Sequence, residues 1–171
     1  MASWRRVFVL GGARSGKSAF AERLALECGA PVVYVATATA VDDEMAERIA
    51  HHRARRPDTW LTIEARTSIV EHLARDSRVN TVLVEDLTLL LSNHMEADVA
   101  RAESRTMDEV QALLTLEANV VLVSNEVGMG LVPSTALGRA FRDALGRVNQ
   151  AAASLCGEVY LVAAGLPLRM K

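Results

Sequence analysis

One short stretch, residues Gly11–Ser18, constrains the fold of this chain more than any other; it reads Gly-Gly-Ala-Arg-Ser-Gly-Lys-Ser. It follows the apolar run 7–10 and precedes a helical pattern that begins at Ala19. The stretch therefore matches the phosphate-binding motif G-x-x-x-x-G-K-[ST] in the strand–loop–helix context that the motif requires. Its glycines leave room for backbone N–H groups to wrap around a phosphate, and the helix N-terminus adds partial positive charge.

Two side chains of this loop have separate expected roles. Lys17 can reach the β- and γ-phosphates of a nucleoside triphosphate, and the Ser18 hydroxyl can bind Mg²⁺. The loop residues predicted to contact the nucleotide are Gly11, Gly12, Ala13, Arg14, Ser15, Gly16, Lys17 and Ser18.

Apolar runs alternate with helical patterns along the rest of the chain. This alternation predicts an α/β fold with a mainly parallel sheet and helices on both faces. Because no linker or repeat interrupts it, we expect one domain over residues 1–171. Strands are expected at about 5–10, 32–36, 60–64, 80–86, 120–124, 158–163 and 166–168. Helices are expected at about 16–28, 42–56, 68–75 with Ser68 as its cap, 98–117, and 134–155 beginning at Ser134, with a loop over 86–98.

Composition excludes several classes of function. The formal net charge is −2 and aromatic residues make up 4%, so neither a basic surface nor an aromatic stripe predicts nucleic-acid binding. No apolar run reaches the roughly 18 residues of a membrane-spanning helix, and the N-terminus has no signal-peptide pattern. We therefore expect a cytoplasmic protein with no membrane span.

Polar residues at strand ends are the functional candidates, because ligands of open parallel sheets bind beyond the carboxyl ends of the strands. Glu85 and Asp86 close an apolar strand, where a phosphate-binding-loop protein places an acid for Mg²⁺. The alternation of the strand does not decide which of the two acids faces the site. A solvated strand end is the alternative interpretation.

The expected helix at 42–56 carries two histidines with different surroundings. On a helix, Glu47, Arg48, His51 and Arg55 share one polar face, whereas His52 lies on the more apolar side. A neutral imidazole is a good nucleophile at pH 7 and can form a phosphoramidate, and neighbouring arginines would stabilise the developing phosphate charge. The alternative is a basic helix face that is merely solvated.

Several segments together carry a resemblance to a known family. They are the Gly11–Ser18 loop, Tyr34–Thr37, Asp42–Met45, His51–Arg53 with Arg56, Pro57 and Trp60, Ser124–Gly130, and Gly146–Gln150. On these residues, and over almost its full length, the chain resembles the bifunctional adenosylcobinamide kinases / adenosylcobinamide-phosphate guanylyltransferases of cobalamin (vitamin B12) biosynthesis. The His-His-Arg and Asn-Glu-Val-Gly-Met-Gly segments are far more particular than the phosphate-binding loop.

The resemblance implies a single-domain, RecA-like P-loop NTPase fold, a homotrimer, and Mg²⁺ as cofactor. It also implies two reactions. ATP or GTP phosphorylates adenosylcobinamide, and GTP then transfers GMP through a guanylylated histidine to adenosylcobinamide phosphate. The family's guanylylated histidine falls on His51. Lys17 of the phosphate-binding loop is the other expected catalytic residue. Its further nucleotide contacts fall on Ala36, Thr37, Ala38, His52, Arg53, Ala54, Arg55, Glu64 and Glu85, with Ser18 and Glu85 toward the metal.

The chain departs from the family pattern at two places. Glu85-Asp86 stands where many members have an acid followed by Cys, and His94-Met95 occupies a usually apolar position. These departures concern the local shape of the 86–98 segment. Two other functions fit the same residues: a small-metabolite kinase whose arginines Arg48, Arg53 and Arg55 clamp phosphates without a covalent step, and a P-loop regulatory module that binds GTP.

Overall fold

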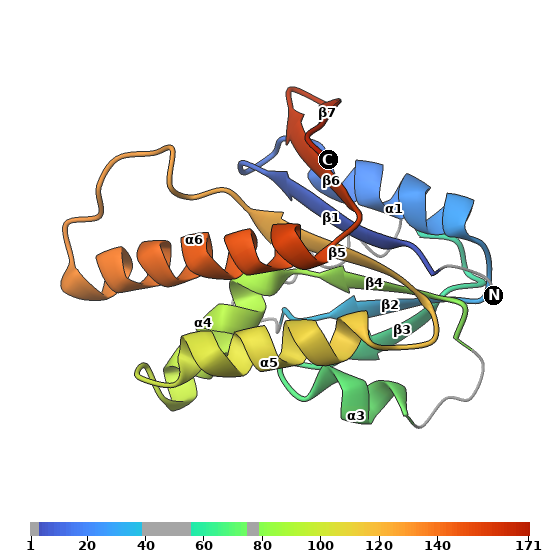
Figure 1. The fold of residues 1–171 in the computed structure, drawn as a ribbon, viewed down its shortest axis with the longest axis horizontal. Helices are drawn as coiled ribbons and strands as arrows, with labels where there is room; N and C mark the ends of the chain where they lie inside the picture. Colours follow the sequence, from blue (N-terminus) through green and yellow to red (C-terminus); the bar gives the residue numbers. More distant parts are fainter. Residues whose placement is uncertain (1–3, 39–55, 75–78) are drawn as a thin grey trace.

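The computed structural model describes residues 4–38, 56–74 and 79–171 (Figure 1). Most predicted elements are present with boundaries shifted by a few residues, while the helix expected at 42–56 lies almost entirely outside the described residues. The strands are β1 (Arg6–Gly11), β2 (Val32–Ala36), β3 (Leu61–Glu64), β4 (Thr81–Glu85), β5 (Asn119–Asn125), β6 (Glu158–Ala163) and β7 (Leu166–Arg169). The helices are α1 (Lys17–Cys28), α3 (Ile69–Leu73), α4 (Leu87–Ala97), α5 (Ala102–Leu114) and α6 (Ala136–Leu155).

The seven strands of the described residues form one sheet in the order β3-β2-β4-β5-β1-β6-β7. Every neighbouring pair is parallel except β6 and β7, which pair antiparallel. The predicted mainly parallel sheet is therefore confirmed. One strand, β5, separates β1 from β4, so the segments following β1 and β4 emerge at the same edge of the sheet with one strand end between them.

Helices cover both faces of the sheet, as predicted (Figure 1). On one face, Phe20 and Leu24 of α1 pack against alternate strand residues such as Val121. On the other face, the layer formed by α3, α4, α5 and α6 covers the intervening residues, including Leu122. Burial on both faces explains why the central strands are continuous apolar runs. Within the described part of the chain, no helix is both long and apolar enough to cross a membrane.

The segment expected to be a loop over 86–98 is a helix, α4, and that prediction was wrong. The Asp86 carboxylate caps it by accepting a hydrogen bond from the Leu89 N–H at 2.9 Å. Three leucines of α4 form its buried face and are fully buried: Leu87, Leu90 and Leu91. The expected helix at 98–117 is correspondingly shorter and begins at Ala102, since the chain turns between the two helices.

The start of α3 also differs from the prediction, because Ser68 makes no side-chain capping bond. Ser68 instead adopts a left-handed backbone conformation with φ of 55°. The Glu109 carboxylate on α5 caps the helix in its place, accepting from the N–H groups of Ser68 at 2.9 Å and Ile69 at 3.1 Å. The same carboxylate lies 2.9 Å from Nε2 of His94, a buried residue of α4, and is its hydrogen-bond partner. One side chain thus connects three helices.

We expect Glu109→Gln to destabilise the protein by about 1–3 kcal/mol, the usual cost of leaving a partly buried polar group without its partner. Glutamine has only one acceptor oxygen. Its NH₂ group would therefore face one of the backbone N–H groups of Ser68 and Ile69, and that N–H would lose its acceptor. Urea unfolding measures the change. Asp108→Asn, at an exposed position of the same helix, should alter the free energy of unfolding by less than about 0.5 kcal/mol. Equal unfolding midpoints for the two variants would contradict this account of α3.

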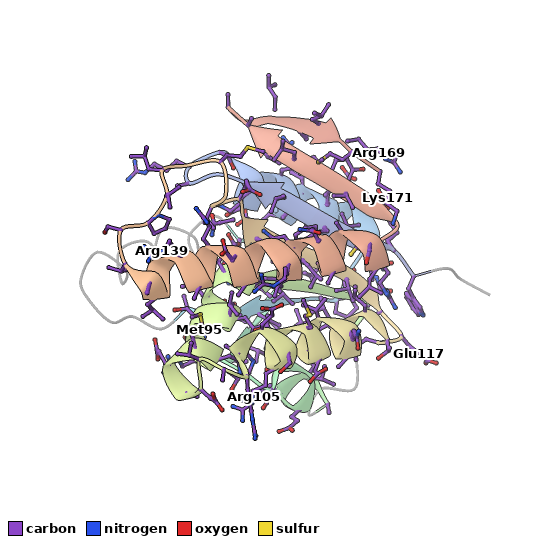
Figure 2. All side chains as sticks on the ribbon, turned by 60° about the vertical axis from the view of Figure 1, so that its left-hand side comes forward. Met95, Arg105, Glu117, Arg139, Arg169 and Lys171 are labelled. Carbon is purple, nitrogen blue, oxygen red and sulfur yellow. The ribbon has the colours of Figure 1, made fainter. Side chains whose placement is uncertain are left out.

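The long helix α6 begins at Ala136, two residues later than the predicted start at Ser134. Thr135 is its N-cap, with the hydroxyl accepting from the Gly138 N–H at 3.1 Å. At the other end, Lys171 Nζ donates to three carbonyl groups, including that of Cys156 at 2.7 Å. Figure 2 shows Lys171 beside this end of the helix and Arg139 near its beginning. A cation at a helix C-terminus is favourable because the carbonyl groups there carry partial negative charge.

Candidate active site

The phosphate-binding loop leaves β1 at Gly11 and enters α1 at Lys17. Gly16 has φ of 93°, a conformation that side chains rarely adopt, and it lies against Gly165 in the β6–β7 turn. A Cβ atom at Gly11 would come within 2.6 Å of the Val162 carbonyl oxygen. The Gly165 N–H donates to the Ser15 carbonyl at 2.8 Å. The end of β6 and the β6–β7 turn therefore pack directly against the loop. This packing requires glycine at positions 11 and 16.

Lys17 lies in the first turn of α1 and is 8% exposed. Its Nζ donates to the Gly12 carbonyl at 3.3 Å, so the side chain folds back over the loop. Burial lowers the pKa of the Lys17 ammonium, while the nearby Asp86 and Glu85 carboxylates act in the opposite direction. The structure thus brings Lys17 and both acids of the β4 end into one site.

Glu85 is the acid that faces the phosphate-binding loop. The Ser18 hydroxyl donates to Glu85 Oε1, and the Tyr34 hydroxyl donates to Glu85 Oε2 at 3.1 Å. Burial raises the pKa of Glu85, partly offset by these hydrogen bonds. The choice between Glu85 and Asp86, which strand alternation left open, is therefore settled for contact with Ser18. The peptide bond between the two acids is cis.

Asp86 serves a different purpose, since its side chain belongs to a polar network under the site. Besides capping α4, it accepts from Asn125 Nδ2 at 3.1 Å. Its backbone N–H donates to the Thr37 hydroxyl at 2.7 Å, and that hydroxyl donates to the Asp86 carbonyl. Thr88 Oγ1 accepts from the Asn125 N–H at 2.9 Å. The ends of β2, β4 and β5 are thereby joined next to the phosphate-binding loop.

Ser18 and Glu85 together fit a magnesium ion. A hydroxyl oxygen and one carboxylate are hard oxygen ligands, and Mg²⁺ retains several waters while binding one or two protein oxygens and the phosphates of a nucleotide. Among the described residues, no group of three or more histidine, cysteine or acidic side chains could form an all-protein metal site. The donor set is thus suited to a metal that arrives with a nucleotide.

Asp86 should make stability depend on pH in a predictable direction. Burial raises the pKa of its carboxyl from 3.8 to about 6. The folded state therefore binds this proton more tightly than the unfolded state, and the stabilisation is fully present below about pH 4 and lost as the pH rises through 6. A pKa difference of this size corresponds to about 3 kcal/mol.

We therefore expect the unfolding free energy of the wild type, relative to Asp86→Asn, to fall by up to about 3 kcal/mol between pH 4 and pH 7. Urea unfolding at several pH values measures the difference between the two profiles. Parallel profiles for the two proteins would contradict a buried, titrating Asp86.

The other predicted nucleotide contacts are distributed unevenly. Ala36 ends β2, and Thr37 and Ala38 follow it at the same sheet edge. The Thr37 hydroxyl is buried and donates to the Asp86 carbonyl. Glu64 ends β3 and is exposed. Two strand spacings, or about 10 Å, separate β3 from β4, whose end carries Glu85, so Glu64 lies on the β3 side of the site. His51, His52, Arg53, Ala54 and Arg55 lie outside the described residues.

Four residues for which the sequence predicted no individual role lie close to this edge of the sheet. Tyr34 contacts Glu85, and the Arg56 guanidinium lies 3.7 Å from the centroid of the Tyr34 ring. Asn125 bonds Asp86, and Asn149 Nδ2 donates to the Asn125 carbonyl at 3.1 Å. A polar residue in an apolar run was the available signal for Tyr34, but the partners of all four residues depend on strand order and helix placement.

Comparison with known proteins adds to this geometry. The family described as cobinamide kinase / cobinamide phosphate guanyltransferase matches residues 7–170. A bifunctional adenosylcobalamin biosynthesis protein, CobP of Pseudomonas aeruginosa, is 44% identical over 97% of this chain and 97% of its own length. CobU of Escherichia coli, named in the same way, is 42% identical over 96% of this chain and 99% of its own length.

The chain is also similar in fold to a solved structure. An ATPase from the type III secretion system of pathogenic bacteria superposes with a TM-score of 0.54 at 12% sequence identity, covering 96% of this chain and 56% of the ATPase. The chain thus has the fold of a P-loop NTPase.

Proposed function

Because this chain belongs to the cobinamide kinase / cobinamide phosphate guanyltransferase family, we propose that its single domain, residues 1–171, carries both activities at one nucleotide site. The observation that supports this proposal best is the cluster of Lys17, Ser18 and Glu85 at one sheet edge, in a chain that the family matches over residues 7–170. The substrates would be adenosylcobinamide and its phosphate, with ATP or GTP as phosphate donor, GTP as GMP donor and Mg²⁺ as cofactor.

In the kinase reaction, the hydroxyl of adenosylcobinamide attacks the γ-phosphorus of the triphosphate, and the bond between that phosphorus and the bridging oxygen breaks. The loop N–H groups and the Lys17 ammonium hold the phosphates and stabilise the charge that develops on them. Ser18 and Glu85 would hold Mg²⁺, which supplies neutralisation of phosphate charge when bound. The chain's own contribution is positioning and electrostatic stabilisation.

In the transferase reaction, an imidazole nitrogen of His51 attacks the α-phosphorus of GTP and pyrophosphate leaves. A phosphate oxygen of adenosylcobinamide phosphate then attacks the same phosphorus, the P–N bond breaks, and adenosylcobinamide-GDP forms. Lys17 would stabilise the departing pyrophosphate at the place where it holds the γ-phosphate donor. The role of His51, and the nucleotide contacts of His52–Arg55, Glu64 and Ala36–Ala38, are proposed on family resemblance.

Assembly and location follow the same family. We propose a homotrimer, which sedimentation equilibrium would measure directly. A cytoplasmic location is proposed because both reactions consume ATP or GTP from the cytoplasmic pool.

The decisive experiment incubates the purified protein with adenosylcobinamide, Mg²⁺ and either ATP alone or ATP with GTP. Chromatography with mass spectrometry then identifies the corrinoid products. We expect adenosylcobinamide phosphate with ATP alone and adenosylcobinamide-GDP when GTP is added. Formation of the phosphate with no GDP product and no protein adduct would instead favour the non-covalent kinase. Slow GTP hydrolysis with an unchanged corrinoid would favour the regulatory module.

A further inference from the structure

The hydrogen bond between Tyr34 and Glu85 suggests a role that the family description does not assign. We infer that Tyr34 is a positioning residue, which orients the Glu85 carboxylate toward Ser18, and that Arg56 holds the Tyr34 ring in place. This inference rests on the proposed use of Glu85 toward Mg²⁺. Neither Tyr34 nor Arg56 would touch the metal.

The sheet brings Tyr34 and Glu85 together from neighbouring strands. In the β2–β4 pairing, Tyr34 is opposite Leu83 and Ala36 is opposite Glu85. Tyr34 and Glu85 are therefore diagonal neighbours on the same face, the α1 face, and this spacing is within reach of an aromatic side chain. Tyr34 is 4% exposed and packs among apolar residues, and its hydroxyl reaches along the sheet to Glu85.

Both oxygens of the Glu85 carboxylate have a defined donor. Ser18 donates to Oε1, and Tyr34 donates to Oε2 at 3.1 Å. A carboxylate held at both oxygens keeps one orientation, whereas one held at a single oxygen can rotate. Burial and the neighbouring Glu85 carboxylate raise the pKa of the Tyr34 phenol, so it remains a neutral donor throughout the physiological range. Outer hydrogen-bond partners of this kind orient metal ligands in many proteins.

Arg56 completes the arrangement from the far side of the ring. Its guanidinium carbon lies 3.7 Å from the Tyr34 ring centroid, within the range of a cation–π contact. Arg56 Nη1 also donates to the Thr62 hydroxyl on β3 at 3.1 Å, which fixes the plane of the guanidinium. A chain of contacts therefore runs from Arg56, which is bonded to β3, through Tyr34 on β2 and Glu85 on β4 to Ser18.

The chain contains a matched control. Tyr160 on β6 also donates to a glutamate, Glu158, at 3.0 Å, and Arg169 lies 5.9 Å from its ring centroid. Glu158 is held by Arg5 rather than by the phosphate-binding loop. Tyr34→Phe and Tyr160→Phe therefore remove the same kind of hydrogen bond and keep the ring, but only the first is connected to Ser18.

The test measures Mn²⁺ binding by electron paramagnetic resonance to the intact protein saturated with a non-hydrolysable GTP analogue. We expect Tyr34→Phe to raise the Mn²⁺ dissociation constant about tenfold and Arg56→Gln to raise it about threefold. Tyr160→Phe should match the wild type. Analogue binding without metal should stay within twofold for all three variants, and thermal unfolding verifies that they are folded.

Wild-type Mn²⁺ affinity in Tyr34→Phe would overturn the inference. So would an equal loss in Tyr34→Phe and Tyr160→Phe, because that result indicates a general effect on the sheet. Glu85→Gln separates the inference from the proposed function. If Glu85→Gln weakens Mn²⁺ binding and Tyr34→Phe does not, only the positioning role is wrong; if Glu85→Gln has no effect, the proposed metal role of Glu85 is wrong as well.

Discussion

Replacing Lys17 by alanine should reduce both the kinase and the guanylyltransferase activities by about 100- to 1,000-fold, the usual loss when one preorganised charge-stabilising group is removed from a site. Lys17 is buried in the phosphate-binding loop and close to both Glu85 and Asp86. In the proposed scheme its ammonium stabilises the transferring γ-phosphate in one reaction and the leaving pyrophosphate in the other. Steady-state assays of each reaction measure the two losses.

Arg23→Ala provides the control, since Arg23 is an exposed cation on the same helix, with its guanidinium near the Phe20 ring. It should retain both activities within about twofold, as expected for a surface substitution away from the site. The Lys17 variant should remain folded, because alanine removes a charge whose burial is unfavourable. Loss of only one activity in Lys17→Ala would contradict the proposal of a shared nucleotide site.

Replacing His51 by alanine should abolish the covalent GMP adduct and lower the guanylyltransferase rate by roughly 1,000-fold or more, as is typical when a catalytic nucleophile is removed. The kinase reaction needs no covalent step on the protein, so its rate should change far less. Incubation with α-labelled GTP, followed by peptide mass spectrometry, measures both the amount of the adduct and its position. The adduct should be labile in acid, as phosphoramidates are.

The four histidines of the chain allow a strict test of this assignment. His72→Ala, on α3, should form the adduct normally. His51 and His52 are adjacent, so the position of the label must be read from fragment ions rather than from the peptide mass. A GMP label on His52, or continued labelling of His51→Ala, would refute the role proposed for His51.

Much of the fold followed from local sequence patterns, and the main error has a physical explanation. Residues 87–91 form a short, almost continuous apolar run, and periodicity cannot assign such a run to a helix or a loop. The N-cap signal of α4 was present as Asp86, but an acid at the end of a strand was also the expected metal ligand. The structure shows that Asp86 caps α4 and Glu85 contacts Ser18.

Capping at α3 illustrates a second limit of local reasoning. Ser68 has the right residue type and position for an N-cap, yet the carboxylate that meets the helix N–H groups comes from Glu109, more than 40 positions along the chain. The buried His94 is explained by the same residue. No local pattern could predict these contacts, because they depend on how α3, α4 and α5 pack together.

The sequence by itself determined the phosphate-binding loop, since its glycines, Lys17 and Ser18 are adjacent and their roles arise from backbone conformation at one strand–helix junction. It also determined the mainly parallel sheet, through the alternation of apolar runs with helical patterns. Only the tertiary structure decided that Glu85, 67 residues from Ser18, meets its hydroxyl while Tyr34 holds the other carboxylate oxygen. The reason is that strand order and register, which local periodicity leaves undetermined, fix which strand ends meet at the loop.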